Sequence, residues 1–165
     1  MARDATEIYQ RHHAEHRLSA AQCDALCSGV RIVNSVEESK ALNRKQMPKV
    51  FIAASGMATG GRVLYLLEAF GPDPRNTILF AGYQAGGTRG AALVEGAGEV
   101  KIHGSYVPIR AEVAQIEHLS AHADSDELIA WLSNFAAPPR KVFITHGEPD
   151  ASDALRKRIE YVHST

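Results

Sequence analysis

Apolar residues recur along the chain at two different spacings. In residues 60–70, Val63, Leu64, Leu67 and Phe70 fall on one face of a helix. Short apolar runs bounded by turn-forming residues have the length and setting of buried strands. On these grounds the sequence predicts helices over 5–17, 20–27, 35–45, 60–70 and 88–95, and strands over 29–33, 49–54 and 76–81. Strands that alternate with helices across short turns favour an α/β fold with a parallel sheet.

The pattern changes at Gly96 and Gly98, where we place a boundary between residues 1–98 and residues 99–165. Beyond it the predicted elements are a strand over 99–102, a turn at His103-Gly104, a strand over 106–117, a helix after Asp124, a strand over 141–145 and a helix over 151–161. The first three form a β-hairpin or meander, because a short turn joins two strands there.

Two histidines stand at junctions between predicted elements. His122 precedes Asp124, which is a good N-cap and forms a capping-box pattern with Glu127. His146 follows the apolar run 141–145. The free N–H groups and the dipole at a helix start favour an anion, and strand ends in open α/β sheets are where ligands bind. A single histidine in such a place is more often an ordinary loop residue. The presence of both His122 and His146 at such junctions is stronger evidence for a functional site than either alone.

Several motifs resemble, in order and spacing, those of one known family. Ser120-Ala121-His122-Ala123-Asp124 and Thr145-His146-Gly147-Glu148 are similar to the last two motifs of the β-CASP branch of the metallo-β-lactamase superfamily. That branch includes RNA-processing nucleases of the RNase J type and the polyadenylation endonuclease. Residues 53–62 and 82–90 resemble it too. The resemblance implies the C-terminal half of a parallel-sheet β-CASP domain, followed by the C-terminal β-hairpin and α/β segment of a metallo-β-lactamase domain.

The resemblance also implies roles for individual residues. His146 matches a histidine that completes a site for two zinc ions, and His122 matches one that faces the scissile phosphate as a proton donor. Ser120 would donate a hydrogen bond to that phosphate. Asp124 and Glu148 would orient the histidines rather than bind metal. The implied activity is therefore metal-dependent hydrolysis of RNA phosphodiesters.

The family's first metal motif, H-x-H-x-D-H, does not occur in these 165 residues. Since one histidine cannot hold two divalent ions, we expect the chain to be the C-terminal part of such a ribonuclease, with an N-terminal metallo-β-lactamase portion as its partner. We expect the isolated chain to be inactive. The alternative from another functional class is a non-catalytic RNA-binding or assembly module.

Two glycine-rich turns are candidates for phosphate binding. The Ser55–Val63 stretch nearly matches a Walker loop, but Arg62 and Val63 occupy the places of its lysine and its serine or threonine, which argues against nucleotide hydrolysis. Ser55, Gly56 and Arg62 remain suited to a polynucleotide phosphate. In the second turn Thr88 can cap a helix and Arg89 can reach a phosphate, although tight turns and a solvated arginine explain the same residues. We expect weak binding of single-stranded RNA.

Charge and hydropathy narrow the functional classes further. With 18 Lys and Arg against 19 Asp and Glu, the net charge of −1 gives no global field for nucleic acid, so RNA contacts must be local. No apolar run is long enough for a membrane span, and we expect a cytoplasmic protein. His12, Glu15 and His16 match H-x-x-E-H, although a solvated helix face is the more ordinary explanation. Open sheet edges favour a homo-oligomer.

Overall fold

The computed structural model describes residues 2–15, 17–44, 48–116 and 122–163. The chain divides into two compact units, Met1–Val50 and Phe51–Thr165, which are described separately below. Among the described residues, no helix combines the length and the apolar character that crossing a membrane requires.

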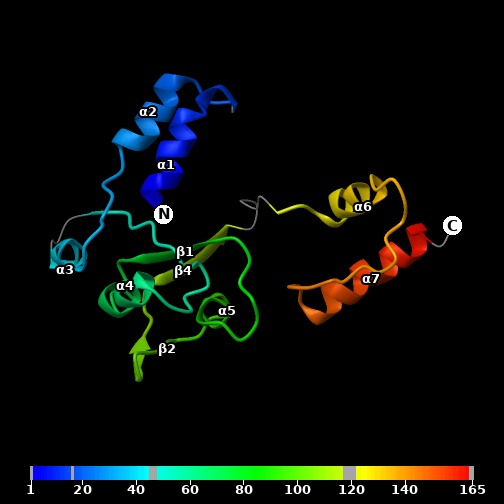
Figure 1. Cartoon of the computed structure of the whole chain (residues 1–165). Helices are drawn as coiled ribbons and strands as arrows, with labels where there is room; N and C mark the ends of the chain where they lie inside the picture. Colours follow the sequence, from blue (N-terminus) through cyan, green and yellow to red (C-terminus); the bar gives the residue numbers. More distant parts are fainter. Residues whose placement is uncertain (1, 16, 45–47, 117–121, 164–165) are drawn as a thin grey trace. The chain divides into compact units, whose positions relative to one another are not determined.

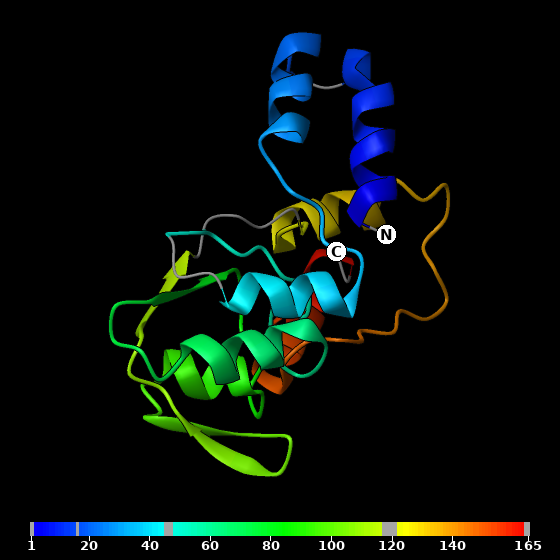
Figure 2. The same ribbon diagram turned by 90° about the vertical axis from the view of Figure 1, so that its left-hand side faces the viewer.

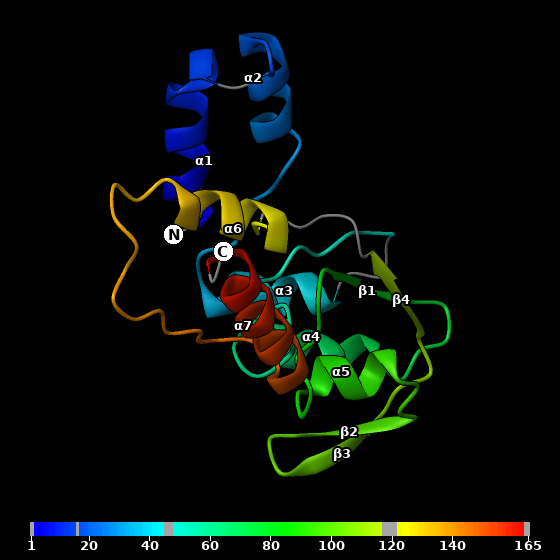
Figure 3. The ribbon, with the colours of Figure 1, turned by 90° about the vertical axis from the view of Figure 1, so that its right-hand side faces the viewer.

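The first unit consists of short helices. They are α1 (Ala2–Arg11), the 3₁₀ helix η1 (His13–Glu15), α2 (Ala20–Ser28) and α3 (Val36–Arg44). Helices α1 and α2 lie side by side in all three views (Figures 1, 2 and 3), and Gln10 Nε2 donates to Asp24 Oδ1 at 2.5 Å. The helix predicted over 5–17 ends at Arg11 instead, because the chain tightens into η1.

The second unit contains the parallel sheet that the sequence predicts. Strand β1 (Thr77–Ala81) pairs with β4 (Glu112–Ile116) in parallel register, Thr77 opposite Glu112 and Ala81 opposite Ile116. Strands β2 (Glu99–Ile102) and β3 (Ser105–Pro108) form an antiparallel hairpin around the predicted His103-Gly104 turn. The mixed α/β class with a parallel sheet is thus confirmed.

Helices α4 (Arg62–Phe70) and α5 (Arg89–Val94) lie between the β1–β4 pair and the β2–β3 hairpin (Figures 1 and 3). Val113 of β4 packs against the core of the unit as a partly buried residue. The buried core itself comes from α4, α5, β1, β2, β3 and adjoining loop residues, and comprises Ala58, Leu64, Leu67, Phe80, Leu93, Val100, Ile102, Val107 and Ile109. Two faces of the helix layer are therefore covered by strands, which gives short elements a common apolar interior.

Three predicted strands are wrong. Residues 29–33, 49–54 and 141–145 are all described, and none of them forms a strand. Val50 and Ile52 are 89% and 87% exposed, and Phe143 is 81% exposed. An apolar run becomes a strand when a neighbouring backbone pairs with it in a ladder, and the ladders of the described residues join only β1 with β4 and β2 with β3. The predicted boundary at residues 96–98 falls in the turn between α5 and β2 and stays a prediction.

Two helices complete the second unit, α6 (Ser125–Ser133) and α7 (Pro149–His163). Arg158 on α7 donates to Ser125 Oγ at 2.5 Å and also pairs with Asp126, at the start of α6. These contacts lie on exposed side chains, so each contributes modestly to stability.

We predict that Gly71→Ala destabilises the second unit by about 1–3 kcal/mol, because an added methyl overfills the packing there. A Cβ at this position would stand 2.5 Å from the Leu67 carbonyl oxygen and 2.6 Å from Ile109 Cδ1. Chemical denaturation monitored by circular dichroism measures the change. Gly98→Ala is the matched control, because a Cβ at position 98 meets nothing within 4 Å. Equal stability of the two variants would contradict the packing argument.

Candidate nucleic-acid interface

The glycine-rich turn before α4 (residues 55–61) is held in unusual backbone conformations. Ser55, Ala58 and Gly61 have φ of 64°, 52° and 75°, and the Ala58 N–H donates to the Ser55 carbonyl at 2.8 Å. Gly61 is the N-cap of α4 and supplies no side-chain hydrogen bond to the first turn of the helix. The predicted phosphate contacts Ser55 and Gly56 are exposed on this turn, and Arg62 is exposed at the first position of α4; the role of all three stays a prediction.

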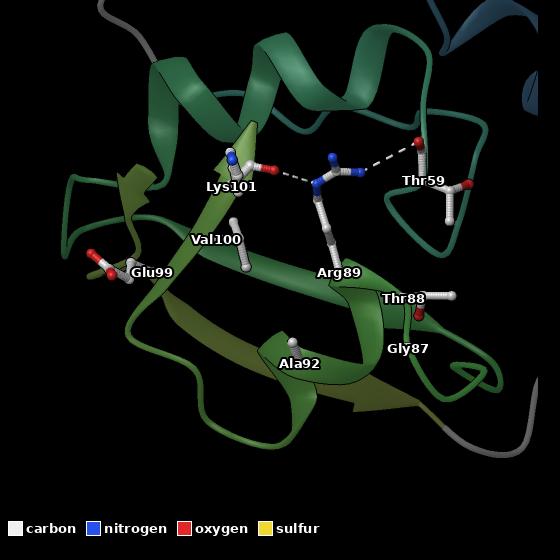
Figure 4. A pocket seen from close by; sticks show the side chains of 8 residues that line it. All are labelled: Thr59, Gly87, Thr88, Arg89, Ala92, Glu99, Val100 and Lys101. Atoms are coloured by element: carbon white, nitrogen blue, oxygen red, sulfur yellow. Dashed lines mark hydrogen bonds between the residues drawn. The ribbon is translucent and has the colours of Figure 1, made fainter. Parts of the chain in front are cut away.

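Arg89 ties this turn to the β2 strand. Its Nε donates to the Lys101 carbonyl at 2.6 Å and its Nη1 donates to the Thr59 carbonyl at 3.4 Å (Figure 4). The same Nη1 also donates to the Ala58 carbonyl at 3.2 Å. The side chain is half-buried and lines a shallow pocket of about 500 Å³ together with Thr88 and Val100. Arg89 therefore connects the 55–61 turn to β2, a role that the sequence did not indicate. Its predicted phosphate contact stays a prediction.

Gly90 allows α5 to approach the glycine-rich turn closely. Its N–H donates to the Met57 carbonyl at 3.0 Å. A Cβ at position 90 would stand 3.1 Å from the Met57 carbonyl oxygen and would overlap the Gln84 amide. Glycine is needed at position 90, because the backbone of α5 lies in close contact with the backbone at Met57.

The loop of residues 82–88 connects β1 to α5 and is bonded to the end of β4. The Gly82 N–H donates to the Ile116 carbonyl at 2.9 Å, and Gln115 Nε2 donates to the Gly82 carbonyl at 2.9 Å. At the other end of the loop, Thr88 Oγ1 accepts from the Ala91 N–H at 3.1 Å. The predicted helix cap at Thr88 is confirmed, and its predicted phosphate contact is untested.

Glu148 brings the turn of residues 145–148 against this loop. Its Oε1 accepts hydrogen bonds from the Tyr83 hydroxyl at 2.9 Å and from the Gly86 N–H at 3.3 Å. The bond to the Glu148 carboxylate raises the pKa of Tyr83 above its usual value near 10.0, so the hydroxyl remains a proton donor. His146, in the same turn, is exposed and has a φ of 68°.

Asp124 caps α6 as the sequence predicts. Its Oδ1 accepts from the N–H groups of Asp126 at 2.8 Å and Glu127 at 2.9 Å, and Glu127 Oε2 accepts from the Asp124 N–H at 3.0 Å. His122 is exposed two residues before this cap. Ser120 lies outside the described residues. The carboxylates of Asp124 and Glu148 thus bond to backbone N–H groups and Tyr83, and their predicted orienting of the histidines stays a prediction.

Zinc does not fit the donor groups that the structure brings together. Within the described part of the chain, no three His, Cys, Asp or Glu side chains converge as metal ligands. A protein zinc site normally needs three or four ligands, so the described residues do not form one by themselves. The H-x-x-E-H pattern needs its residues on one face of a helix, but α1 ends at Arg11, before His12. The Nδ1 atom of His12 lies 2.7 Å from Glu15 Oε1. His16 lies outside the described residues.

Sequence reasoning missed Tyr83, Gly90 and Gln115 as residues that assemble the site. Their partners are far away in the chain, 65 positions for Tyr83 and Glu148 and 33 for Gln115 and Gly82. Periodicity and capping patterns report contacts within one or two turns, so they carry no signal for such pairs. The family-like motif at residues 82–90 contains Tyr83 and Gly90, and it was the one sequence feature that could have pointed to them.

Two family models match most of the chain. Residues 1–93 match the family model of the Beta-Casp domain, and residues 106–164 match that of the Zn-dependent metallo-hydrolase RNA specificity domain. Among the curated proteins, a ribonuclease of Thermus thermophilus is 43% identical over 132 residues, which is 80% of this chain and 30% of that protein.

Two archaeal relatives extend the comparison. The transcription termination factor FttA of Methanosarcina mazei is 34% identical over 132 residues, covering 77% of this chain and 21% of the factor. An RNase J-like protein of Methanocaldococcus jannaschii is 37% identical over 116 residues, covering 70% of this chain and 26% of that protein. The chain therefore spans less than a third of the length of each of these three relatives.

We predict that Arg89→Ala lowers stability by about 2 kcal/mol, because three backbone carbonyls lose a charged donor. Arg89→Lys should not restore it, since one ammonium cannot replace the spaced Nε and Nη1 donors. Thermal unfolding of both variants measures the effect. Arg110→Ala, a change of the same charge at an exposed position, is the control. Full stability in Arg89→Lys would show that charge, rather than the fork of donors, matters here.

Proposed function

The chain belongs to the β-CASP family of RNA-processing metallo-hydrolases, and from that membership we propose that it forms the RNA-contacting part of a metal-dependent ribonuclease. The observation that carries the proposal is the 43% identity with a protein named as a ribonuclease, over 80% of this chain. The match of residues 106–164 to an RNA specificity domain supports RNA as the substrate.

In this proposal the exposed turns contact the RNA through different groups. Ser55 and Gly56 in the turn of residues 55–61, with Arg62 directly after it, offer backbone N–H groups and one guanidinium to the RNA phosphates. His122 faces the scissile phosphate and donates a proton to the leaving oxygen, a role that histidine often has in catalysis. His146 contributes a single metal ligand, and the other ligands come from outside the described residues.

A non-catalytic RNA-binding or assembly module is the second candidate. It is favoured by the similarity to proteins named as transcription termination factors, at 34% identity over 132 residues for the Methanosarcina factor. Both candidates use the same turns to hold RNA. They differ in whether His122 and His146 take part in bond cleavage.

We predict weak, salt-sensitive binding of single-stranded RNA, with a dissociation constant of tens of micromolar or weaker as a rough magnitude, because a near-neutral chain releases few counterions. Arg62→Ala should weaken binding and flatten its salt dependence, since one phosphate contact is lost. Fluorescence anisotropy of a labelled oligouridylate at two salt concentrations measures both. Arg110→Ala controls for net charge, and equal binding by Arg62→Ala and Arg110→Ala would refute the assignment of the 55–61 turn.

We predict that the purified 165-residue chain does not cleave RNA with added zinc or manganese, because the described residues assemble no group of three ligands. In a longer family protein that carries both H-x-H-x-D-H and this chain, His146→Ala should lower metal content and rate together. His122→Ala should lower the rate by about 10²–10⁴-fold and keep the metal, since a proton donor does not hold the ion. Elemental analysis beside cleavage rates separates the two, and equal metal loss would contradict the assigned roles.

A further inference from the structure

The carboxylate oxygen Oε1 of Glu148 connects the turn of residues 145–148 to the loop of residues 82–88, which is distant in sequence. The Tyr83 hydroxyl and the Gly86 N–H both donate to Glu148 Oε1, at 2.9 Å and 3.3 Å. Tyr83 is 63% exposed, so burial of its ring does not explain why it lies here. The hydrogen bond itself is the specific contact, and a hydroxyl bonded to a carboxylate is among the stronger ones.

Glu148 is fixed firmly to the turn that carries His146. The Ser152 N–H donates to the Glu148 carbonyl at 2.9 Å, which connects Glu148 to the first turn of α7. A Cβ at position 147 would stand 2.6 Å from Ser152 Oγ, so glycine at this position lets the turn lie close to the helix. His146 itself has a left-handed φ of 68°, a conformation that costs energy unless its surroundings hold it.

Tyr83 is fixed equally firmly to the sheet. Its neighbour Gly82 bonds to β4 in both directions, by its N–H to the Ile116 carbonyl and by its carbonyl to Gln115 Nε2, each at 2.9 Å. A side chain that starts here and ends on Glu148 therefore connects the carboxyl ends of β1 and β4 to the start of α7.

We propose that Tyr83 and Glu148 are positioning residues, which hold the His146 turn on the 82–88 loop at the carboxyl end of the parallel strand pair. The link gives His146 a defined place relative to the sheet, although residues 141–145 form no strand of that sheet. This positioning role rests on the proposed function, in which the surface that carries His146 binds RNA.

The experiment compares four variants of the 165-residue chain by amide hydrogen exchange of Gly86 and by anisotropy of a labelled oligouridylate. Glu148→Ala removes the shared acceptor, and Glu148→Gln keeps an Oε1 acceptor without the charge. Tyr83→Phe removes one donor. Tyr106→Phe is the matched control, a tyrosine of similar exposure (65%) on the β2–β3 hairpin.

In Glu148→Ala we expect Gly86 to exchange about tenfold faster at an unchanged unfolding temperature, because a charge-assisted hydrogen bond is lost locally. Glu148→Gln should return the rate to within about twofold of the wild type, and Tyr83→Phe should fall between the two. Tyr106→Phe should match the wild type. A Gly86 exchange rate that Glu148→Ala leaves unchanged would overturn the proposal.

The RNA measurement separates this inference from the proposed function. RNA binding that weakens in Glu148→Ala and recovers in Glu148→Gln supports both. Faster Gly86 exchange with unchanged RNA affinity keeps the positioning role of Tyr83 and Glu148, and it removes the His146 turn from the RNA-binding surface. Loss of RNA binding in Tyr106→Phe as well would trace the effect to a general disturbance and overturn the positioning role.

Discussion

The parallel pairing of β1 with β4 is the constraint on which the second unit depends. Parallel strands cannot be joined by a tight turn, so the chain between them must cross over and cover the sheet. Here the crossover contains α5 and the β2–β3 hairpin, and it buries Leu93, Val100 and Ile102 against α4. The same pairing brings the ends of both strands to one edge, where the 82–88 loop starts.

Hydrogen bonds to main-chain carbonyls connect the segments around that edge. Arg89 donates to carbonyls of the 55–61 turn and of Lys101 in β2, Gly90 donates to the Met57 carbonyl, and Gln115 donates to the Gly82 carbonyl. Loops have no ladder of their own to satisfy these groups, so a side chain or a close backbone must do it. These bonds connect the turns to the sheet and to α5, an arrangement that suits the proposed contact with a phosphate backbone.

Several features followed from the sequence because their causes are local. Asp124 and Glu127 form the capping contacts expected from residues three positions apart. The α4 helix and the His103-Gly104 turn likewise depend on neighbours within one turn of the chain. The family motifs were also readable, since each is a short string of residues.

Tertiary structure decided the rest. The runs 49–54 and 141–145 have strand-like composition, yet a strand exists only where another backbone supplies its hydrogen bonds, and composition does not carry that information. In the same way, the tasks of Arg89 and Glu148 depend on which carbonyls, hydroxyl and N–H groups the fold brings within reach. The sequence by itself determined local elements and candidate chemistry, whereas partners distant along the chain determined which elements paired and how the site was held.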